Sequence, residues 1–438
     1  MMISMLVQAL YNIVDSIFVA RVCEDALTAV SMAFPLQSLL IAIGAGTGVG
    51  INALLSRALG EKKNDEASAI AMNGVFLTVC SYILFVVVGL TCVKPFYLGQ
   101  TDNTVISTYG IQYLTIVCCM SFGVFMQFTF ERLLQSTGKT IYTMYTQGIG
   151  AIVNLILDPI FIFGMFGMPR MEVAGAAVAT VIGQLVAGGL AVFFNLHVNK
   201  EISFRVRGFR PSGRIIGRIY EIAVPSIIMQ SIGSVMVYGI NMILMLFSST
   251  AVAVFGVYFK LQSFVFMPVF GLNNGLIPIM AYNYGAKKRK RMLDAYKYAC
   301  IMAVGIMLVG VVVFELIPGV LFNLFAASDA MLEMGTVALR IIGIHFPVAA
   351  ICIVTGAVFQ ALGKAVYSMI NSIMRQLVVL LPVAFVLALT GNVNNVWWAI
   401  PIAEVMSGLV TFIFYIRIKS KIINKIPVED IEEKKIIA

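Results

Sequence analysis

Two acidic residues lie within apolar segments that are long enough to cross a lipid bilayer. Asp15 is in the first such segment and Asp158 is in the fifth. A carboxylate at mid-bilayer costs at least about 2.5–3.5 kcal/mol, so an acid at such a position usually faces an interior cavity and marks a path for ions or protons. The chemistry open to these two residues is reversible binding of a proton or a hard cation.

Amide and hydroxyl side chains accompany both acids at helical spacing. One helical face carries Gln8, Tyr11, Asn12 and Asp15. A second face carries Gln147, Asn154 and Asp158, with Asn154 one turn before Asp158. Pro159 has no N–H and so frees the carbonyl oxygen of Leu155 beside Asp158.

Such oxygen atoms suit a hard cation. We therefore interpret Asp15, Asn154 and Asp158 as a site for a coupling proton or for Na⁺. The alternative is that Asp15 and Asp158 are hydrogen-bonded packing residues. The cost of burying two acids in a membrane argues against that alternative.

The composition shows what must position these side chains. Of 438 residues, 60% are hydrophobic and 12% are charged, whereas soluble domains run at about 45–50% apolar and about 25% charged. Apolar runs of helical span length recur throughout, without the alternation of a barrel strand. The fold class is therefore an all-α integral membrane protein.

The net charge of +9 resides in short segments between apolar runs, which disfavours a nucleic-acid partner.

The sequence predicts twelve transmembrane helices, at residues 1–21, 28–55, 68–92, 108–132, 141–163, 173–196, 219–246, 252–280, 295–318, 335–360, 366–389 and 397–416. On this topology, 23 Lys and Arg residues share a side with both termini and three lie opposite. The positive-inside rule then places both termini in the cytoplasm. The counterpart of Arg218 would fall before Met1, so the first helix is expected to lack its opening turns.

The chain contains an internal repeat at a constant offset of 225 residues. Gly60 recurs as Gly285, and Lys62-Lys63 recurs as Lys287-Lys288. Two pseudo-symmetric six-helix lobes of equal orientation follow, as in transporters that bind substrate between repeats. The predicted parts are an N-terminal lobe at 1–196, a basic cytoplasmic linker at 197–218, a C-terminal lobe at 219–416 and a cytoplasmic tail at 417–438.

Three stretches resemble the multidrug and toxic compound extrusion (MATE) family. They are Tyr11-Asn12-Ile13-Val14-Asp15-Ser16, Phe34-Pro35-Leu36-Gln37, and Asn154-Leu155-Ile156-Leu157-Asp158-Pro159. The resemblance implies a MATE-like fold and alternating access. It also implies export of organic, mostly cationic compounds across the plasma membrane, in exchange for H⁺ or Na⁺. It adds Thr180 to the coupling site.

The repeat predicts that coupling resides in the N-terminal lobe, since Asp15, Asn154 and Asp158 map onto Ile240, Val379 and Val383. The C-terminal half instead has Lys260, Arg340, His345, Arg375 and Glu404 in or near its spans. We expect Glu404 to neutralise Arg375 or Lys260, and Arg340 to reach the outer surface. The side chains interpreted as substrate-cavity candidates are Gln8, Tyr11, Asn12, Gln37, Gln147, Gln262, Arg375 and Glu404.

Two other functions remain open. A lipid-linked saccharide flippase could use the basic residues of the C-terminal half to hold a pyrophosphate. A membrane enzyme acting on lipids ranks last, because the chain has two His residues and short non-cytoplasmic loops. We expect no enzymatic activity and no cofactor beyond the coupling ion. The expected partners are small-molecule substrates and the lipid bilayer, around a monomer in a bacterial plasma membrane.

Overall fold

The computed structural model describes residues 2, 5–7, 18–19, 22–204, 209–325 and 328–427. Over these residues the secondary structure is helical. Nine helices are long and apolar enough to span a membrane, and two bent pairs raise the number to eleven in the described part of the chain. The remaining predicted span, at 1–21, falls largely outside the described residues.

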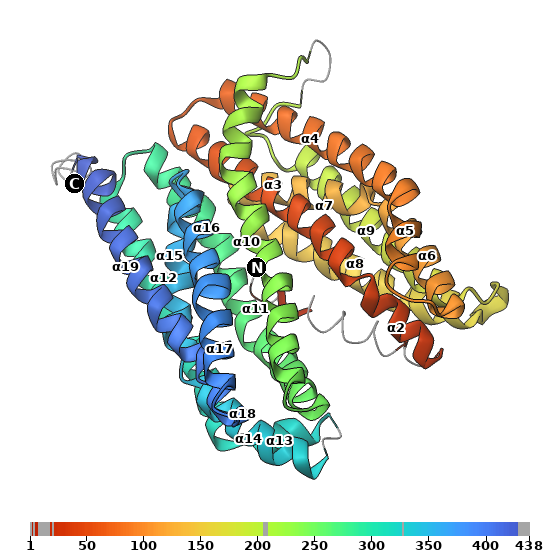
Figure 1. Ribbon diagram of the computed structural model, residues 1–438. Coiled ribbons are helices and arrows are strands. Elements are labelled where there is room, and N and C mark those ends of the chain that lie inside the picture. The colour runs from red at the N-terminus through yellow and green to blue at the C-terminus, as the bar shows by residue number, and fades with distance from the viewer. Residues whose placement is uncertain are drawn as a thin grey trace. The chain divides into compact units, whose positions relative to one another are not determined.

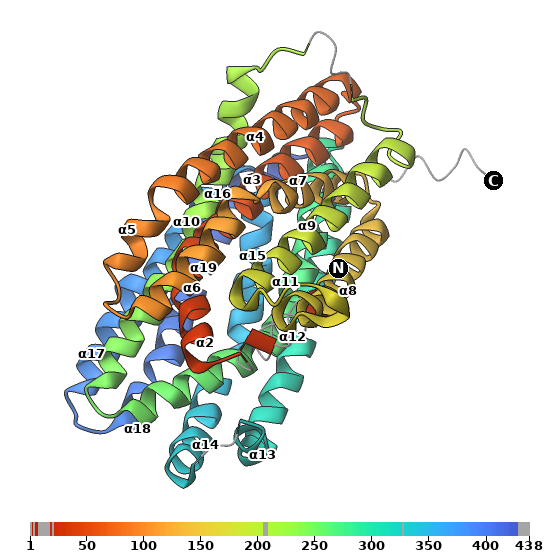
Figure 2. The same cartoon turned by 90° about the vertical axis from the view of Figure 1, so that its right-hand side faces the viewer.

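The chain divides into two compact units. The first unit comprises Met1–Leu55 and Asn64–Ile227. Its helices are α2 (Glu24–Met32), most of α3 (Phe34–Gly60), α4 (Asn64–Thr91), α5 (Val93–Leu98), α6 (Thr104–Cys119), α7 (Phe122–Ser136), α8 (Thr140–Phe163), α9 (Glu172–His197) and the start of α10 (Gly213–Met245). Figures 1 and 2 show α8 and α9 side by side, and α9 also packs against α7.

The second unit comprises Ser56–Lys63 and Ile228–Ala438. It contains the end of α3, the rest of α10, α11 (Ser249–Gly285), α12 (Arg289–Leu316), α13 (Pro318–Asn323), α14 (Asp329–Gly343), α15 (Phe346–Ala361), α16 (Ala365–Ile373), the π-helix Met374–Leu380, α17 (Leu381–Ala388), α18 (Val393–Val396) and α19 (Ala399–Lys421). Here α15 packs against α11, α12 and α19.

Two predicted spans are bent rather than continuous. The segment predicted at 108–132 is α6 and α7, which meet at 44°, and the segment predicted at 335–360 is α14 and α15, which meet at 50°. Pro347 lies in the first turn of α15 and cannot donate a backbone hydrogen bond, which accounts for the second break. Pro159, in contrast, lies inside α8 without ending it.

The internal repeat is visible in the backbone conformation of equivalent turns between helices. Lys62 and Lys287, which are repeat mates, both have positive φ, at 60° and 57°. The same holds for Gly138 and Gly363, at 78° and 73°. Lys139 and Lys364 then donate their backbone N–H to the carbonyls of Leu134 and Phe359 at the same distance, 2.8 Å. Equivalent sequences therefore adopt equivalent turns 225 residues apart.

Within the second unit, the C-terminal end of α3 packs against the C-terminal end of α11. A Cβ atom on Gly60 would overlap the carbonyl oxygen of Tyr282, and one on Gly285 would overlap the carbonyl oxygen of Arg57. Arg57 is the repeat mate of Tyr282. The contact is therefore reciprocal, and its close backbone approach requires glycine on both sides.

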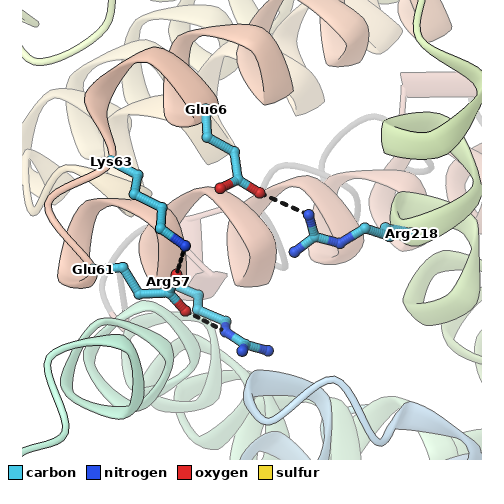
Figure 3. Close-up of polar contacts among 5 residues, drawn as sticks. All are labelled: Arg57, Glu61, Lys63, Glu66 and Arg218. Atoms are coloured by element: carbon cyan, nitrogen blue, oxygen red, sulfur yellow. Dashed lines mark hydrogen bonds and ion pairs between the residues drawn. The ribbon is translucent and has the colours of Figure 1, made fainter.

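Ion pairs stabilise the turn that follows α3. In the second unit, Glu61 accepts from Arg57 Nε at 2.9 Å and from Lys63 Nζ at 2.7 Å (Figure 3). In the first unit, Glu66 at the start of α4 pairs with Arg218 of α10 at 2.7 Å (Figure 3). The carboxylate of Glu66 also lies at the helix N-terminus, where negative charge is favourable.

Candidate coupling site

The central candidate residues of the first unit lie together. Asn154 Nδ2 of α8 is 3.2 Å from Asp158 Oδ1 and 3.4 Å from Thr180 Oγ1 of α9. All three are buried, Asp158 completely. The structure thus brings together Asn154 and Asp158, which helical spacing grouped, and Thr180, which entered through the family resemblance.

Small residues allow the two helices of this site to approach closely. A Cβ on Gly183 of α9 would lie 2.8 Å from the carbonyl oxygen of Gly150 and 3.0 Å from Cβ of Asn154. Because nothing larger than glycine fits there, α9 lies against α8 at the level of Asn154, which brings Thr180 within hydrogen-bonding distance. The amide oxygen of Asn154 has no hydrogen-bond partner among the described residues. This oxygen can therefore accept a hydrogen bond or ligate a cation.

The fourth predicted coupling residue, Asp15, lies outside the described residues, as do Gln8, Tyr11 and Asn12. Within the described part of the chain, His, Cys, Asp and Glu form no group of three that could hold a metal ion. The proposed Na⁺ set of Asp15, Asn154 and Asp158 therefore remains a prediction.

The structure adds an acid that the sequence analysis overlooked. Glu131 of α7 is 3% exposed, and three neutral side chains donate hydrogen bonds to it. Its Oε1 accepts from Gln127 at 3.0 Å and from Thr146 at 2.8 Å, and its Oε2 accepts from Gln147 at 2.7 Å. Gln147 belongs to the polar face of α8 that also carries Asn154 and Asp158. Glu131 therefore extends that face toward the start of α8.

Arg132, next in sequence, is among the basic residues assigned to the side of both termini, and that assignment stays a prediction. The structure shows that α7 continues to Ser136 and that Arg132 is only 7% exposed. Gly48 of α3 leaves room for it, since a Cβ there would lie 2.8 Å from Arg132 Cγ. Its guanidinium donates to Gln135 Oε1 at 2.9 Å. One signal could have indicated burial, namely the spacing of four between Gln127, Glu131 and Gln135.

The substrate-cavity candidates are divided between the two units. In the first unit, Gln37 donates to the hydroxyl of Tyr113 at 3.3 Å, and Gln147 donates to Glu131. In the second unit, Gln262 is half-buried on α11, and Arg375 pairs with Glu404 at 3.0 Å. The expectation that Glu404 neutralises Arg375 is confirmed.

The other charged residues of the second unit fit structural roles. The ring of His345 is buried, with Nδ1 2.5 Å from the carbonyl oxygen of Ile342. Arg340 is exposed and lies 3.9 Å from Glu315. Lys260 is exposed on α11, with its ammonium 6.0 Å from the ring of Phe325.

Comparison with known proteins gives one consistent result. The model of the MatE family matches residues 1–160 and 225–386. The multidrug export protein MepA of Staphylococcus haemolyticus is 27% identical over 422 residues, which cover 95% of this chain and 91% of that protein. MepA of Staphylococcus aureus is 26% identical over 431 residues, covering 96% and 92%.

Solved structures agree in fold. A MATE crystal structure in complex with MaL6 superposes with a TM-score of 0.91 at 25% identity, covering 97% of this chain and 95% of that one. A MOP superfamily transporter from Pyrococcus furiosus, described as having a binding pocket of reverse polarity, gives a TM-score of 0.90 at 25% identity, with coverage of 97% and 94%.

Proposed function

The chain belongs to the MatE family of multidrug efflux transporters, and we propose that it exports organic, mostly cationic compounds by antiport with H⁺ or Na⁺. The observation that carries this proposal is the buried cluster of Asn154, Asp158 and Thr180 between α8 and α9. A fully buried carboxylate within a span is expensive unless it binds something during function. In this proposal both termini lie in the cytoplasm.

The proposed coupling ion binds at Asp158, with Asn154 and Thr180 as neighbouring oxygen donors. Asp15, predicted on the first helix, would complete the site. Occupation of the site by H⁺ or Na⁺ favours one state of the transporter and substrate favours the other. Reciprocity requires that each ligand weaken binding of the other by the same factor.

Glu131 of α7 places an acid beside the polar face of α8, at Gln147. Gln147 and Asp158 are eleven positions apart, which corresponds to about 16 Å along the helix. Glu131 is therefore too far from Asp158 for direct contact, and we propose that it serves as the next acceptor on the same path. Its three donors offset part of the cost of burying a carboxyl group within a span.

The flippase alternative loses one of its supports, Arg375, in the second unit. It required free basic residues to hold a pyrophosphate, whereas Arg375 is engaged by Glu404. A guanidinium that is already neutralised by a carboxylate offers little attraction to a second anion.

The test is transport by the purified chain in liposomes, with pH and Na⁺ gradients imposed separately. We expect a fluorescent cation such as ethidium to accumulate only when an imposed gradient drives H⁺ or Na⁺ in the opposite direction across the membrane. Equal transport without either gradient would contradict antiport. Accumulation of a lipid-linked saccharide in the opposite leaflet, with no cation transport, would favour the flippase.

A further inference from the structure

The second unit contains an ion pair between a half-buried arginine and a buried glutamate, in unusual backbone geometry. Arg375 Nη1 lies 3.0 Å from Glu404 Oε2, and the side chain of Glu404 is 4% exposed. Arg375 belongs to the seven-residue π-helix Met374–Leu380 that joins α16 to α17. Such π-turns within helices occur frequently at functional sites, because they redirect side chains at the expense of regular hydrogen bonding.

Only one oxygen of Glu404 is satisfied. Its Oε1 is buried and has no hydrogen-bond partner among the residues that the structure describes. A buried carboxylate normally needs a hydrogen bond at each oxygen as well as a counter-ion, since its desolvation is otherwise not compensated. The open oxygen is therefore free to accept a proton or a hydrogen bond.

A polar stripe leads away from this oxygen along α19. Glu404, Ser407 and Thr411 are at spacings of three and four, and all are buried. Ser407 Oγ donates to Asn371 Oδ1 of α16 at 3.2 Å. At the level of Thr411 the stripe meets a cavity of about 220 Å³. Its lining is mostly apolar and includes Val348, Ile351 and Phe412, with the hydroxyl groups of Tyr296, Thr355 and Thr411 as polar groups. Any water in this cavity would have to bind at these hydroxyl groups.

The chemistry of the open oxygen selects a proton over a metal cation. Na⁺ and other hard cations need several oxygen ligands at once, and Glu404 offers one open oxygen. The guanidinium of Arg375, 3.0 Å from the other oxygen, would also repel a metal ion. Further groups that interact electrostatically with Glu404 are Tyr258 of α11, His345 beside α15 and Cys352 of α15.

We propose that Glu404 binds a second transported proton and that Arg375 controls its release. In the state described here Arg375 pairs with Glu404 at 3.0 Å and so balances its charge. When the π-helix rearranges and Arg375 withdraws, a proton reaches Oε1 from the cavity and neutralises Glu404. This inference rests on the proposed function with H⁺ as coupling ion, and it adds a site in the half of the chain that lacks an equivalent of Asp158.

The experiment compares the full-length parent, Glu404→Gln and the double variant Arg375→Met/Glu404→Leu in proteoliposomes. The double variant replaces the ion pair by apolar side chains, a change that buried pairs often tolerate. The number of protons exchanged for each substrate molecule is calculated from the pH gradient at which net transport stops. We expect both variants to exchange one proton fewer than the parent. Glu315→Gln, which removes the exposed pair with Arg340, is the matched control and should leave the ratio unchanged.

A second measurement does not depend on transport. Infrared difference spectra of the protein between about pH 5 and about pH 9 report the carbonyl stretch of protonated carboxylic acids. We expect one such band to be absent in Glu404→Gln. A parent ratio retained in both variants, or a complete set of bands in Glu404→Gln, would overturn the inference. If the parent transports without any response to pH, the proposed H⁺ coupling is contradicted. Loss of the band in Glu404→Gln would then mean that Glu404 binds a proton that is not transported.

Discussion

At the scale of single residues, Asp158 has no acidic counterpart in the second half of the chain. Its repeat mate is Val383 of α17. Asp158→Asn removes the exchangeable charge and keeps the side-chain volume, so we expect coupled efflux to fall to background while expression is retained. Val383→Asn should leave coupling largely unchanged. Both are measured as gradient-driven uptake of a fluorescent cation, and equal losses at the two positions would exclude a site confined to the first unit.

Glu131 offers a prediction about stability. Glu131→Ala would remove the acceptor shared by Gln127, Thr146 and Gln147. The two glutamines are half-buried, and Thr146 also donates to the carbonyl oxygen of Thr143. Since an unsatisfied buried group costs about 1–3 kcal/mol, we expect a total loss within about that range. Glu131→Gln keeps an acceptor and should lose less. Thermal unfolding in detergent measures both, with the exposed Asp102→Asn as control; equal melting temperatures for parent and Glu131→Ala would refute the network.

Helical spacing was sufficient to predict that Asn154 and Asp158 lie on the same face of a helix, because residues one turn apart share a face whatever surrounds the helix. Glu131 was not predicted, since Arg132 beside it resembled the basic end of a span. The burial of Arg132 depends on Gly48 of α3, far away in the sequence, which leaves space for its side chain. The neutralisation of Arg375 by Glu404 was expected, but the π-helix that holds Arg375 has no local sequence signal that we recognise.

At the scale of elements, the meeting of α3 and α11 depends on two glycines. Gly60→Ala and Gly285→Ala each place a methyl group on a backbone carbonyl of the other helix, which cannot move aside as a side chain could. We expect each variant to lower the melting temperature, by an amount that corresponds to about 1–3 kcal/mol. Gly275→Ala is the control, because no atom lies within 4 Å of the added Cβ. A similar small effect at all three positions would argue against the close approach.

The turn after α3 should be sensitive to acid. Burial opposes ionisation of Glu61, but hydrogen bonds from Lys63 and Arg57 outweigh it and lower the pKa of its carboxyl. A lowered folded-state pKa contributes stability above the unfolded pKa, and this contribution is lost as the pH falls through the folded pKa. The pair is partly exposed, so the contribution is about 1 kcal/mol or less.

Glu61→Gln should therefore lower the melting temperature slightly at neutral pH and flatten its decline on acidification. The measurement is the melting temperature of parent and variant between about pH 7 and about pH 3. Parallel curves for the two proteins would show that Glu61 gains nothing from its partners.

At the scale of the whole molecule, the orientation in the membrane is still a prediction. With the seven native cysteines replaced, single cysteines at Asp102 and Val393 should react with an impermeant thiol reagent added outside intact cells. Cysteines at Lys63 and Lys288 should react only after the cells are opened. The basic asymmetry of the loops is the physical reason, and the reverse pattern would invert the topology.

The sequence was informative about the large-scale plan because hydropathy and charge act over whole spans. It could not predict that the two compact units divide α3 and α10, so that Ser56–Lys63 belongs with the second unit. The bends at 44° and 50° were likewise missed, since apolar composition is the same on both sides of a break. A count of spans therefore treats as straight two segments that the structure shows to be bent.

The reciprocal contact of Gly60 and Gly285 also has a meaning for the history of the chain. Two identical subunits related by a two-fold axis meet so that residue i touches j while j touches i. Gly60 against Tyr282, and Gly285 against Arg57, reproduces that arrangement inside one polypeptide. It is the pattern expected if a half-length ancestor formed a homodimer through this corner before gene duplication and fusion made the interface intramolecular.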